Sequence, residues 1–217
     1  MKLKNLAEEI GGLLLAKNLT LGLAESCTGG LLAAAITDIP GSSGYFNGSI
    51  VAYRNKVKKK VLKVTTPCLR KFGAVSAETA AAMARGARKA TTAKIGLSLT
   101  GIAGPSGGTK DKPVGLVYVG LDARKLPLTL PSPQRVEGNF SFILSSPLRG
   151  EDKGEGDKKG KSYVIKLRMV RQFNFSGNRQ EIRQAACIKA LELLKDFLEK
   201  VKTAHGDHNR IIQRKSD

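Results

Sequence analysis

Apolar residues form two kinds of pattern along the chain, a helical spacing in some segments and short apolar runs in others. Leucine and isoleucine recur at helical spacing near the start, so residues 3–17 are expected to form an amphipathic helix. Short apolar runs bounded by turn residues predict strands, and the stretches between them predict helices. The expected strands are 20–24, 49–53, 94–100, 114–121 and 163–170, and the other expected helices are 31–36, 55–63, 77–90 and 180–198. Strands that alternate with helices indicate an α/β fold with a mostly parallel or mixed sheet.

Residues 122–161 interrupt this pattern. The stretch from Lys125 to Lys161 contains four of the eight prolines and shows no hydrophobic period. A structureless connection of this length is uncommon inside a compact domain. We therefore expect one domain over residues 1–200, interrupted by a flexible insertion at about 124–161, and a disordered basic tail over 201–217.

The charge balance raises the question of a nucleic-acid partner. The chain has 37 Lys and Arg against 18 Asp and Glu, for a net charge of +19. The basic residues are scattered apart from one cluster between Arg54 and Lys63, and aromatic residues make up only 5% of the chain. With so few aromatic side chains for base stacking, nucleic acid is not expected as a partner. The lack of any apolar run of about 20 residues predicts no membrane span, and a cytoplasmic location is expected.

The cysteines and histidines limit the possible chemistry. Cys27, Cys68 and Cys187 show no CxxC spacing, so neither a zinc site nor a disulfide framework is expected. Both histidines, His205 and His208, lie in the polar tail, and we expect no metal site there. A nucleophilic site in this chain therefore needs a base other than histidine.

Ser26 is the first candidate for such chemistry, because it lies where a short strand turns into a helix. Unpaired peptide N–H groups at a helix start can stabilise the negative oxygen of a tetrahedral intermediate. Gly29 and Gly30 remove side chains that would block the approach of a substrate. The alternative is that Ser26 or Thr28 only caps the helix. Cys27 is expected to be a small buried residue.

Lys58 is the candidate base. A lysine can deprotonate a serine only if its pKa falls toward neutrality, and both desolvation and neighbouring cations such as Lys56, Lys59 and Lys60 act in that direction. The alternative is an ordinary solvated helix face. A third candidate is the glycine-rich loop at residues 100–105, where backbone amides could contact a ligand or simply form a tight turn.

Several of these motifs together resemble one known family. Ala24–Gly30 reads AESCTGG and closely resembles the signature of the CinA C-terminal domain family, the nicotinamide-nucleotide amidases also called PncC. Further similar segments follow in the order and spacing of that family: residues 40–43, the Tyr-x-Asn-x-x-Lys pattern at 53–58, and residues 73–76, 100–105, 112–115 and 175–183. The resemblance covers residues 3–121 and 163–198. One departure is Asn178, which stands where the family usually has Asp.

The resemblance implies a three-layer α/β/α sandwich with a mixed, mostly parallel sheet. It also implies hydrolysis of the carboxamide of nicotinamide mononucleotide to nicotinate mononucleotide and ammonia, without a cofactor, by a homodimer. By the same resemblance Ser26 is the nucleophile, Lys58 its base and Tyr53 a proton-relaying or orienting partner. The implied substrate-binding residues are Thr28, Gly29 and Gly30 near the oxyanion or amide, Asn55, the pocket-lining Thr100, Gly101, Ile102, Ala103 and Gly104, and Arg179 at the phosphate.

Two other functions remain open from the sequence. One is a non-catalytic protein of the competence or damage-inducible type that binds nucleotide or nucleic acid through the basic patch at Lys58, Lys59 and Lys60. The other is a module that holds the nucleotide but is inactivated by the insertion.

Overall fold

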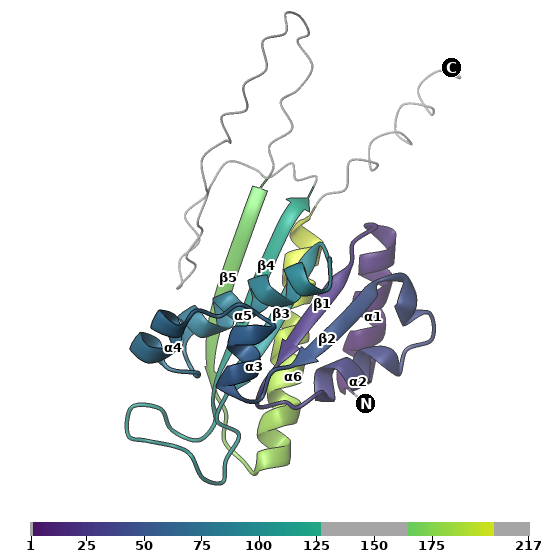
Figure 1. The fold of residues 1–217 in the computed structure, drawn as a ribbon. Coiled ribbons are helices and arrows are strands. Elements are labelled where there is room, and N and C mark those ends of the chain that lie inside the picture. The colour runs from purple at the N-terminus through teal and green to yellow at the C-terminus, as the bar shows by residue number, and fades with distance from the viewer. Residues whose placement is uncertain (1, 127–164, 202–217) are drawn as a thin grey trace, which may run out of the picture.

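The structure, a computed structural model, describes residues 2–126 and 165–201. Its centre is one five-stranded sheet with the strand order β2-β1-β3-β4-β5 (Figure 1). The strands are β1 (Leu21–Glu25), β2 (Phe46–Val51), β3 (Ile95–Gly101), β4 (Leu116–Leu126) and β5 (Ile165–Asn174). β1 pairs in parallel with β2 and β3, and β4 pairs antiparallel with β3 and β5. Four strands therefore point the same way and β4 opposes them.

Helices cover both faces of the sheet (Figure 1). On one face lie α1 (Lys2–Ala16), α2 (Leu31–Thr37) and α6 (Arg179–Lys200), which pack against one another. On the other face lie α3 (Asn55–Lys60), α4 (Thr66–Phe72) and α5 (Ala77–Ala90), with α5 lying across β1, β3 and β4. A short 3-10 helix, η1 (Ser42–Gly44), precedes β2. No helix in the part of the chain described combines the length and apolar character that crossing a membrane requires.

This architecture confirms the predicted α/β/α sandwich with a mixed sheet whose strands mostly run in parallel. The prediction for α5 is confirmed at both ends, and the Ser76 hydroxyl caps it by accepting the Thr79 N–H, with Glu78 in the first turn. The expected strand at 49–53 instead covers Phe46–Val51, and α4 was not predicted.

The predicted strand at 114–121 ends too early. β4 does not end at residue 121 but continues to Leu126, because its second half pairs with β5 as far as the Leu126–Ile165 pair. Alternation along this half is hard to see in the sequence, since Asp122 is buried with Arg partners rather than exposed. The rest of the predicted insertion, from residue 127, and the tail from residue 202 lie outside the described residues.

Glycines in the sheet let α5 approach closely. A Cβ atom on Gly96 of β3 would collide with the Ala84 carbonyl oxygen and the Arg88 backbone of α5, and one on Gly120 of β4 would meet the Ala80 carbonyl at 2.6 Å. Close-packed interiors do not absorb an added methyl group without displacing backbone. The glycines of β3 and β4 thus set the distance between helix and sheet.

Gly96→Ala is therefore expected to lower the free energy of unfolding by about 1–3 kcal/mol, the usual cost of overpacking. The matched control is Gly12→Ala in α1, where an added Cβ would meet nothing within 4 Å. That control should raise stability by about 0.5–1 kcal/mol, because alanine favours a helix interior over glycine. Urea unfolding of both variants measures these two changes in the free energy of unfolding, which should have opposite signs. Equal changes would contradict the idea that Gly96 sets the distance between α5 and the sheet.

Candidate functional site

The predicted site residues meet at one edge of the sheet. β1, β2, β3 and β5 run in the same direction, so their carboxyl ends lie together, toward the bottom of Figure 1. Ser26 directly follows β1, Lys58 follows β2, and Gly104 follows β3, while Arg179 begins α6 shortly after β5. Between β1 and β3 the strand order changes direction, which is where open α/β sheets commonly bind their ligands.

Ser26 and Lys58 are in direct contact. The Lys58 Nζ atom lies 2.9 Å from the Ser26 Oγ atom, although the residues are 32 positions apart in the chain. Nζ also lies 2.6 Å from the Ala52 carbonyl oxygen and 3.1 Å from the Tyr53 carbonyl oxygen. Both side chains are buried, with 9% of Ser26 and 1% of Lys58 exposed. The structure thus brings into contact the two residues that the sequence predicts as nucleophile and base.

Burial changes the acidity of this lysine. Desolvation disfavours the charged ammonium, and it lowers the pKa of Lys58 from 10.5 to about 8. With a pKa near 8, about one lysine in ten is a neutral amine at pH 7. Lys58 is therefore able to accept a proton close to neutral pH, as a general base must.

The neighbouring cations are not the cause of this shift. Lys56, Lys59 and Lys60 are exposed on α3 and do not contribute to the lowered pKa of Lys58. That part of the expectation is wrong, because water screens charges on exposed side chains. The alternative of a solvated face also fails for Lys58 itself, which is the buried residue of α3.

The amino end of α2 is occupied by Glu25 rather than left open. The buried Glu25 carboxylate accepts hydrogen bonds from the N–H groups of Gly30, Leu32 and Ala33 at 3.0, 3.2 and 2.8 Å. Neither Ser26 nor Thr28 caps the helix: Gly30 holds the N-cap position, and no side-chain cap bond is made there. Glu25 thereby compensates the positive end of α2.

This arrangement changes the expected oxyanion donors. The Gly29 N–H donates to the Ser26 carbonyl oxygen at 3.2 Å, and the Gly30 N–H donates to Glu25. Neither N–H group is free to bind an oxyanion, contrary to the expectation for these two glycines. The peptide N–H groups of Cys27 and Thr28 donate to no oxygen atom within the described residues. Both lie within reach of the Cys27 sulfur and next to Ser26 in the sequence.

Cys27 is not a competing nucleophile. Its side chain is buried, and burial raises the pKa of its thiol from 9.0 to about 11. A thiol must lose its proton to become nucleophilic, so Cys27 stays inert near neutral pH. This agrees with the expectation of a small buried residue. Cys27, Cys68 and Cys187 are all free thiols.

Arg179 links three of the loops at this edge. Its Nη1 atom donates to the Gly104 carbonyl oxygen at 2.6 Å, and its Nη2 atom donates to the Tyr53 hydroxyl at 3.2 Å. The Tyr53 hydroxyl therefore contacts Arg179, while the Tyr53 carbonyl contacts Lys58. Of the two expected roles of Tyr53, these contacts favour the orienting one. Asn178 caps α6 by accepting the N–H groups of Gln180 and Glu181, which an Asp could also do.

The glycine-rich segment after β3 is mainly a support. The Thr100 hydroxyl is buried and donates to the Ala74 carbonyl oxygen at 2.7 Å. Gly101 belongs to β3, where a Cβ would meet the Leu116 carbonyl at 2.6 Å, and the Ile102 N–H donates to that same carbonyl. Ala103 is buried. Only Gly104 of this segment is seen to bond a predicted site residue. Asn55 begins α3 and is exposed.

Arg183 is a site residue that the sequence argument passed over. It lies one turn after Arg179 on α6, and its Nε and Nη2 atoms both donate to the Thr28 carbonyl oxygen, at 3.2 and 2.6 Å. Thr28 is fully buried, and its hydroxyl has no hydrogen-bond partner among the described residues. The signal that could have found Arg183 is its spacing of four residues from Arg179, which puts both on one helix face.

Comparison with known proteins points to one family. The model of the CinA C-terminal domain matches residues 3–139. A putative competence-damage inducible protein from Halothermothrix orenii is 62% identical over 117 residues, which cover 54% of this chain and 28% of that protein. A CinA-like protein from Endomicrobium trichonymphae is 44% identical over 190 residues, which cover 88% of this chain and 35% of that protein. The chain thus spans about a third of the length of such relatives.

Solved structures agree with this. The competence/damage inducible protein CihA from Agrobacterium tumefaciens superposes with a TM-score of 0.67 and 34% identity, covering 92% of this chain and 96% of that one. The competence damage-inducible protein A from Klebsiella pneumoniae has a TM-score of 0.69 at 24% identity, covering 92% and 99%, and supports the fold alone.

Proposed function

The chain belongs to the CinA C-terminal domain family, and we propose that it hydrolyses the carboxamide of nicotinamide mononucleotide with Ser26 as nucleophile and Lys58 as base. The observation that carries this proposal is the 2.9 Å contact between Lys58 Nζ and Ser26 Oγ in a buried setting. The choice of substrate rests on the resemblance of the Ala24–Gly30 segment to the amidase signature. Arg179 supports it with a cation at the same edge.

Two backbone carbonyls orient the lysine. An ammonium has three N–H donors, and Lys58 has three acceptors in reach: the Ala52 carbonyl, the Tyr53 carbonyl and the Ser26 hydroxyl oxygen. Carbonyl oxygens only accept, so a neutral Lys58 keeps its two N–H groups on them. Its lone pair is then directed at Ser26, where it accepts the hydroxyl proton. Deprotonation thus converts the contact from N–H···O to N···H–O without moving either side chain.

Acyl transfer follows from this geometry. Ser26 Oγ attacks the carboxamide carbon while its proton passes to Lys58 Nζ. The carbon–nitrogen bond of the tetrahedral intermediate then breaks, and Lys58 returns the proton to the departing nitrogen, which leaves as ammonia. The nicotinoyl group remains as an ester on Ser26. Water, deprotonated by Lys58, attacks this ester, and nicotinate mononucleotide leaves as Ser26 regains its proton.

The oxyanion and the phosphate need separate donors. The peptide N–H groups of Cys27 and Thr28 donate to no oxygen atom within the described residues and lie next to Ser26 in the chain, and we assign the developing oxyanion to them. Arg179 uses two of its five N–H donors on Gly104 and Tyr53 and is otherwise exposed. Its remaining donors suit the phosphate of the nucleotide.

The purified protein is expected to release ammonia from nicotinamide mononucleotide, with a pH dependence set by Lys58. Because the neutral amine is the active form and its pKa is about 8, kcat/KM should rise about tenfold per pH unit below pH 8 and level off above it. A coupled ammonia assay between pH 6 and 9.5 measures this profile.

Two other results would change the proposal. A rate that falls with rising pH would contradict a neutral lysine base. Tight binding of nicotinamide mononucleotide without ammonia release over the whole pH range would contradict the enzymatic function. It would support a module that only binds the nucleotide.

A further inference from the structure

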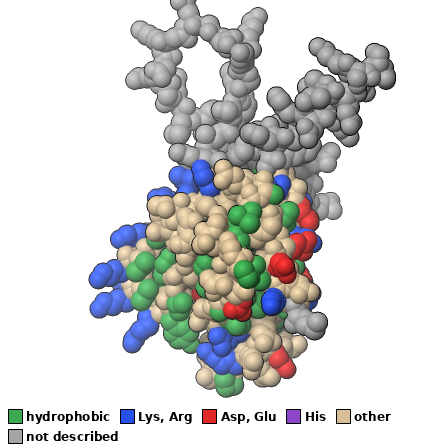
Figure 2. Space-filling model, turned by 90° about the vertical axis from the view of Figure 1, so that its right-hand side faces the viewer, with side chains coloured by type: hydrophobic (Ala, Val, Ile, Leu, Met, Phe, Trp, Pro, Cys, Tyr) green, Lys and Arg blue, Asp and Glu red, His purple; other side chains and the backbone are tan. Residues whose placement is uncertain are grey.

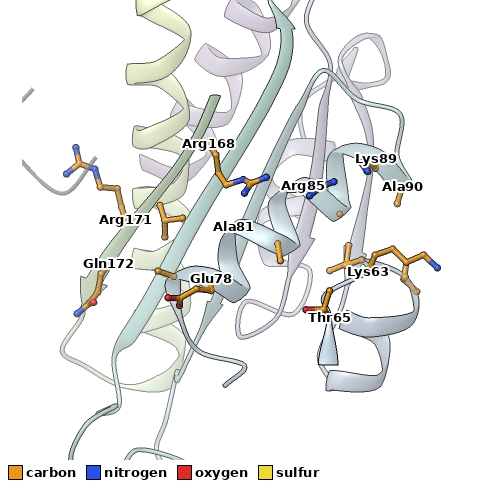
Figure 3. A pocket seen from close by; sticks show the side chains of 16 residues that line it. Lys63, Thr65, Glu78, Ala81, Arg85, Lys89, Ala90, Arg168, Arg171 and Gln172 are labelled. Carbon is orange, nitrogen blue, oxygen red and sulfur yellow. The ribbon is translucent and has the colours of Figure 1, made fainter. Parts of the chain in front are cut away.

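On the face of the sheet that carries α5, the described residues leave one position without a covering helix. α5 lies over β1, β3 and β4, whereas the neighbouring side of β5 is only partly covered: Arg168 and Val170 are half-buried and Gln172 is exposed. An open groove of about 1620 Å³ runs along α5, with β5 on one side and the segment between α3 and α4 on the other (Figure 3). In a layered α/β fold this is where another helix would cover the sheet.

The floor of the groove is apolar and made of small side chains. The apolar and small lining residues are Ala77, Ala81, Ala82, Gly86 and Ala90 of α5, Val61 and Leu62 of the preceding segment, and Val170 of β5. Small residues along one side of a helix allow a second helix to approach at the usual interaxial distance of about 8–10 Å. The volume exceeds the roughly 300–1,000 Å³ of small-molecule pockets, so a macromolecular segment fits this groove better.

The walls of the groove are cationic. Lys63, Arg85, Lys89 and Arg168 line it, together with Arg171, and Glu78 is the one acidic residue among the lining side chains. The surrounding stretch from residue 51 to residue 100 contains twelve Lys and Arg and one acidic residue. Figure 2 shows the result as basic side chains gathered along its left edge, which is the α3–α5 side, with acidic side chains toward the right.

Two arginines converge across the groove. In Figure 3 the side chains of Arg85 on α5 and Arg168 on β5 extend toward one another. Beneath them the buried Asp122 carboxylate bonds Arg88 Nε at 2.6 Å and Arg168 Nε at 3.4 Å. One carboxylate is thus shared by two arginines, and Arg85 adds a further positive charge. Guanidinium groups brought together in this way favour a carboxylate or phosphate between them.

From these features we propose that the groove receives an acidic amphipathic helix of a partner protein. The apolar stripe of that helix packs on the alanines of α5, and its carboxylates pair with Arg85, Lys89 and Arg168. A nucleic-acid strand fits less well, because none of the described residues that line the groove is aromatic and able to stack on a base. A second copy related by twofold symmetry is disfavoured too, since it would bring the same cations face to face.

The test uses the whole protein and a fluorescein-labelled peptide of leucine and glutamate about 15 residues long, which matches α5 at ~1.5 Å per residue. Fluorescence anisotropy should show binding of this peptide, and no binding of a version with glutamine in place of every glutamate. The double variant Arg85→Glu/Lys89→Glu should weaken binding at least tenfold, whereas Lys4→Glu on the opposite face should not change it. Arg85 and Lys89 are both exposed on α5, so the double variant should still fold.

A second variant separates helix docking from simple charge attraction. Ala81→Trp fills the floor without changing any charge and should also weaken peptide binding at least tenfold. No peptide binding, or binding that ignores both variants, overturns the proposal, as does tighter binding of a DNA oligonucleotide that the charge reversal abolishes. Ammonia release from nicotinamide mononucleotide should be unchanged in all these variants, which keeps this test independent of the proposed enzymatic function.

Discussion

Ser26→Ala is expected to lower kcat for ammonia release from nicotinamide mononucleotide by at least ~10³-fold, because removing a nucleophile removes the covalent route as a whole. The substituted side chain is small and 9% exposed, so the fold should not change. Binding of the nucleotide should stay within a few-fold of the wild type, since Arg179 and the peptide groups of the turn remain. A single-turnover ammonia assay combined with calorimetric titration measures both quantities.

Matched variants at neighbouring residues test whether Ser26 Oγ is the nucleophile. Ser49→Ala removes a half-buried serine hydroxyl whose contact is Glu25 at 3.5 Å, and it should retain nearly full activity. Cys27→Ala should also remain active, because its thiol has a pKa of about 11 and stays protonated. Loss of activity in Cys27→Ala together with its retention in Ser26→Ala would move the nucleophile by one residue.

The elements that could be predicted from sequence are those with a clear period or cap. α5 has an alanine-rich face and a Ser76 cap, and both of its ends were predicted correctly. α4 was missed although Thr65 caps it and Pro67 stands in its first turn, because only seven residues carry its pattern. The far half of β4 was missed because Asp122 looks like a loop residue until its arginine partners, distant in sequence, are known.

The predicted site residues come from separate turns and motifs in the sequence, and the fold explains why several of them lie at one edge of the sheet. Once the strands are placed, a parallel arrangement brings the residues after β1, β2 and β3 to one edge, which accounts for Ser26, Lys58 and Gly104. What sequence could not supply is the hydrogen-bond partner of each group. Glu25, for example, accepts the N–H groups of Gly30, Leu32 and Ala33 at the start of α2, which its position in the sequence does not reveal.

Lys58 shows most clearly why local pattern was insufficient. Four of the six residues of α3 are lysines, and a run of this kind is normally solvated. Burial of the one at position 58 follows from the helical turn that directs it back toward β1 and the Ser26 turn, a tertiary contact 32 residues away in sequence. Its low pKa then comes from desolvation, which no count of neighbouring charges reveals.

Lys58→Met is expected to remove activity, by at least ~10³-fold in kcat, and at the same time to make the protein more stable at pH 7. A pKa lowered from 10.5 to about 8 means that the fold holds this charge at a disadvantage of about 3 kcal/mol, at ~1.4 kcal/mol per pKa unit. Methionine fills a similar volume without charge but leaves the Ala52 and Tyr53 carbonyls without their donor, which offsets about 1–2 kcal/mol. The expected gain in the free energy of unfolding is about 1–2 kcal/mol.

The pH dependence of stability is a second test of whether Lys58→Met is more stable than the wild type at pH 7. Between pH 8 and 10.5 the unfolded chain binds more protons at residue 58 than the folded chain, so the wild type gains stability as the pH rises through that window. Lys58→Met lacks this gain, and its advantage at pH 7 should vanish by about pH 10. Urea unfolding at the two pH values measures the difference, with the exposed neighbour Lys59→Met as control, for which no such dependence is expected. If Lys58→Met were less stable than the wild type at pH 7, and by the same amount at pH 10, the buried amine would be an ordinary structural contact, and its desolvation could not be the source of its basicity toward Ser26.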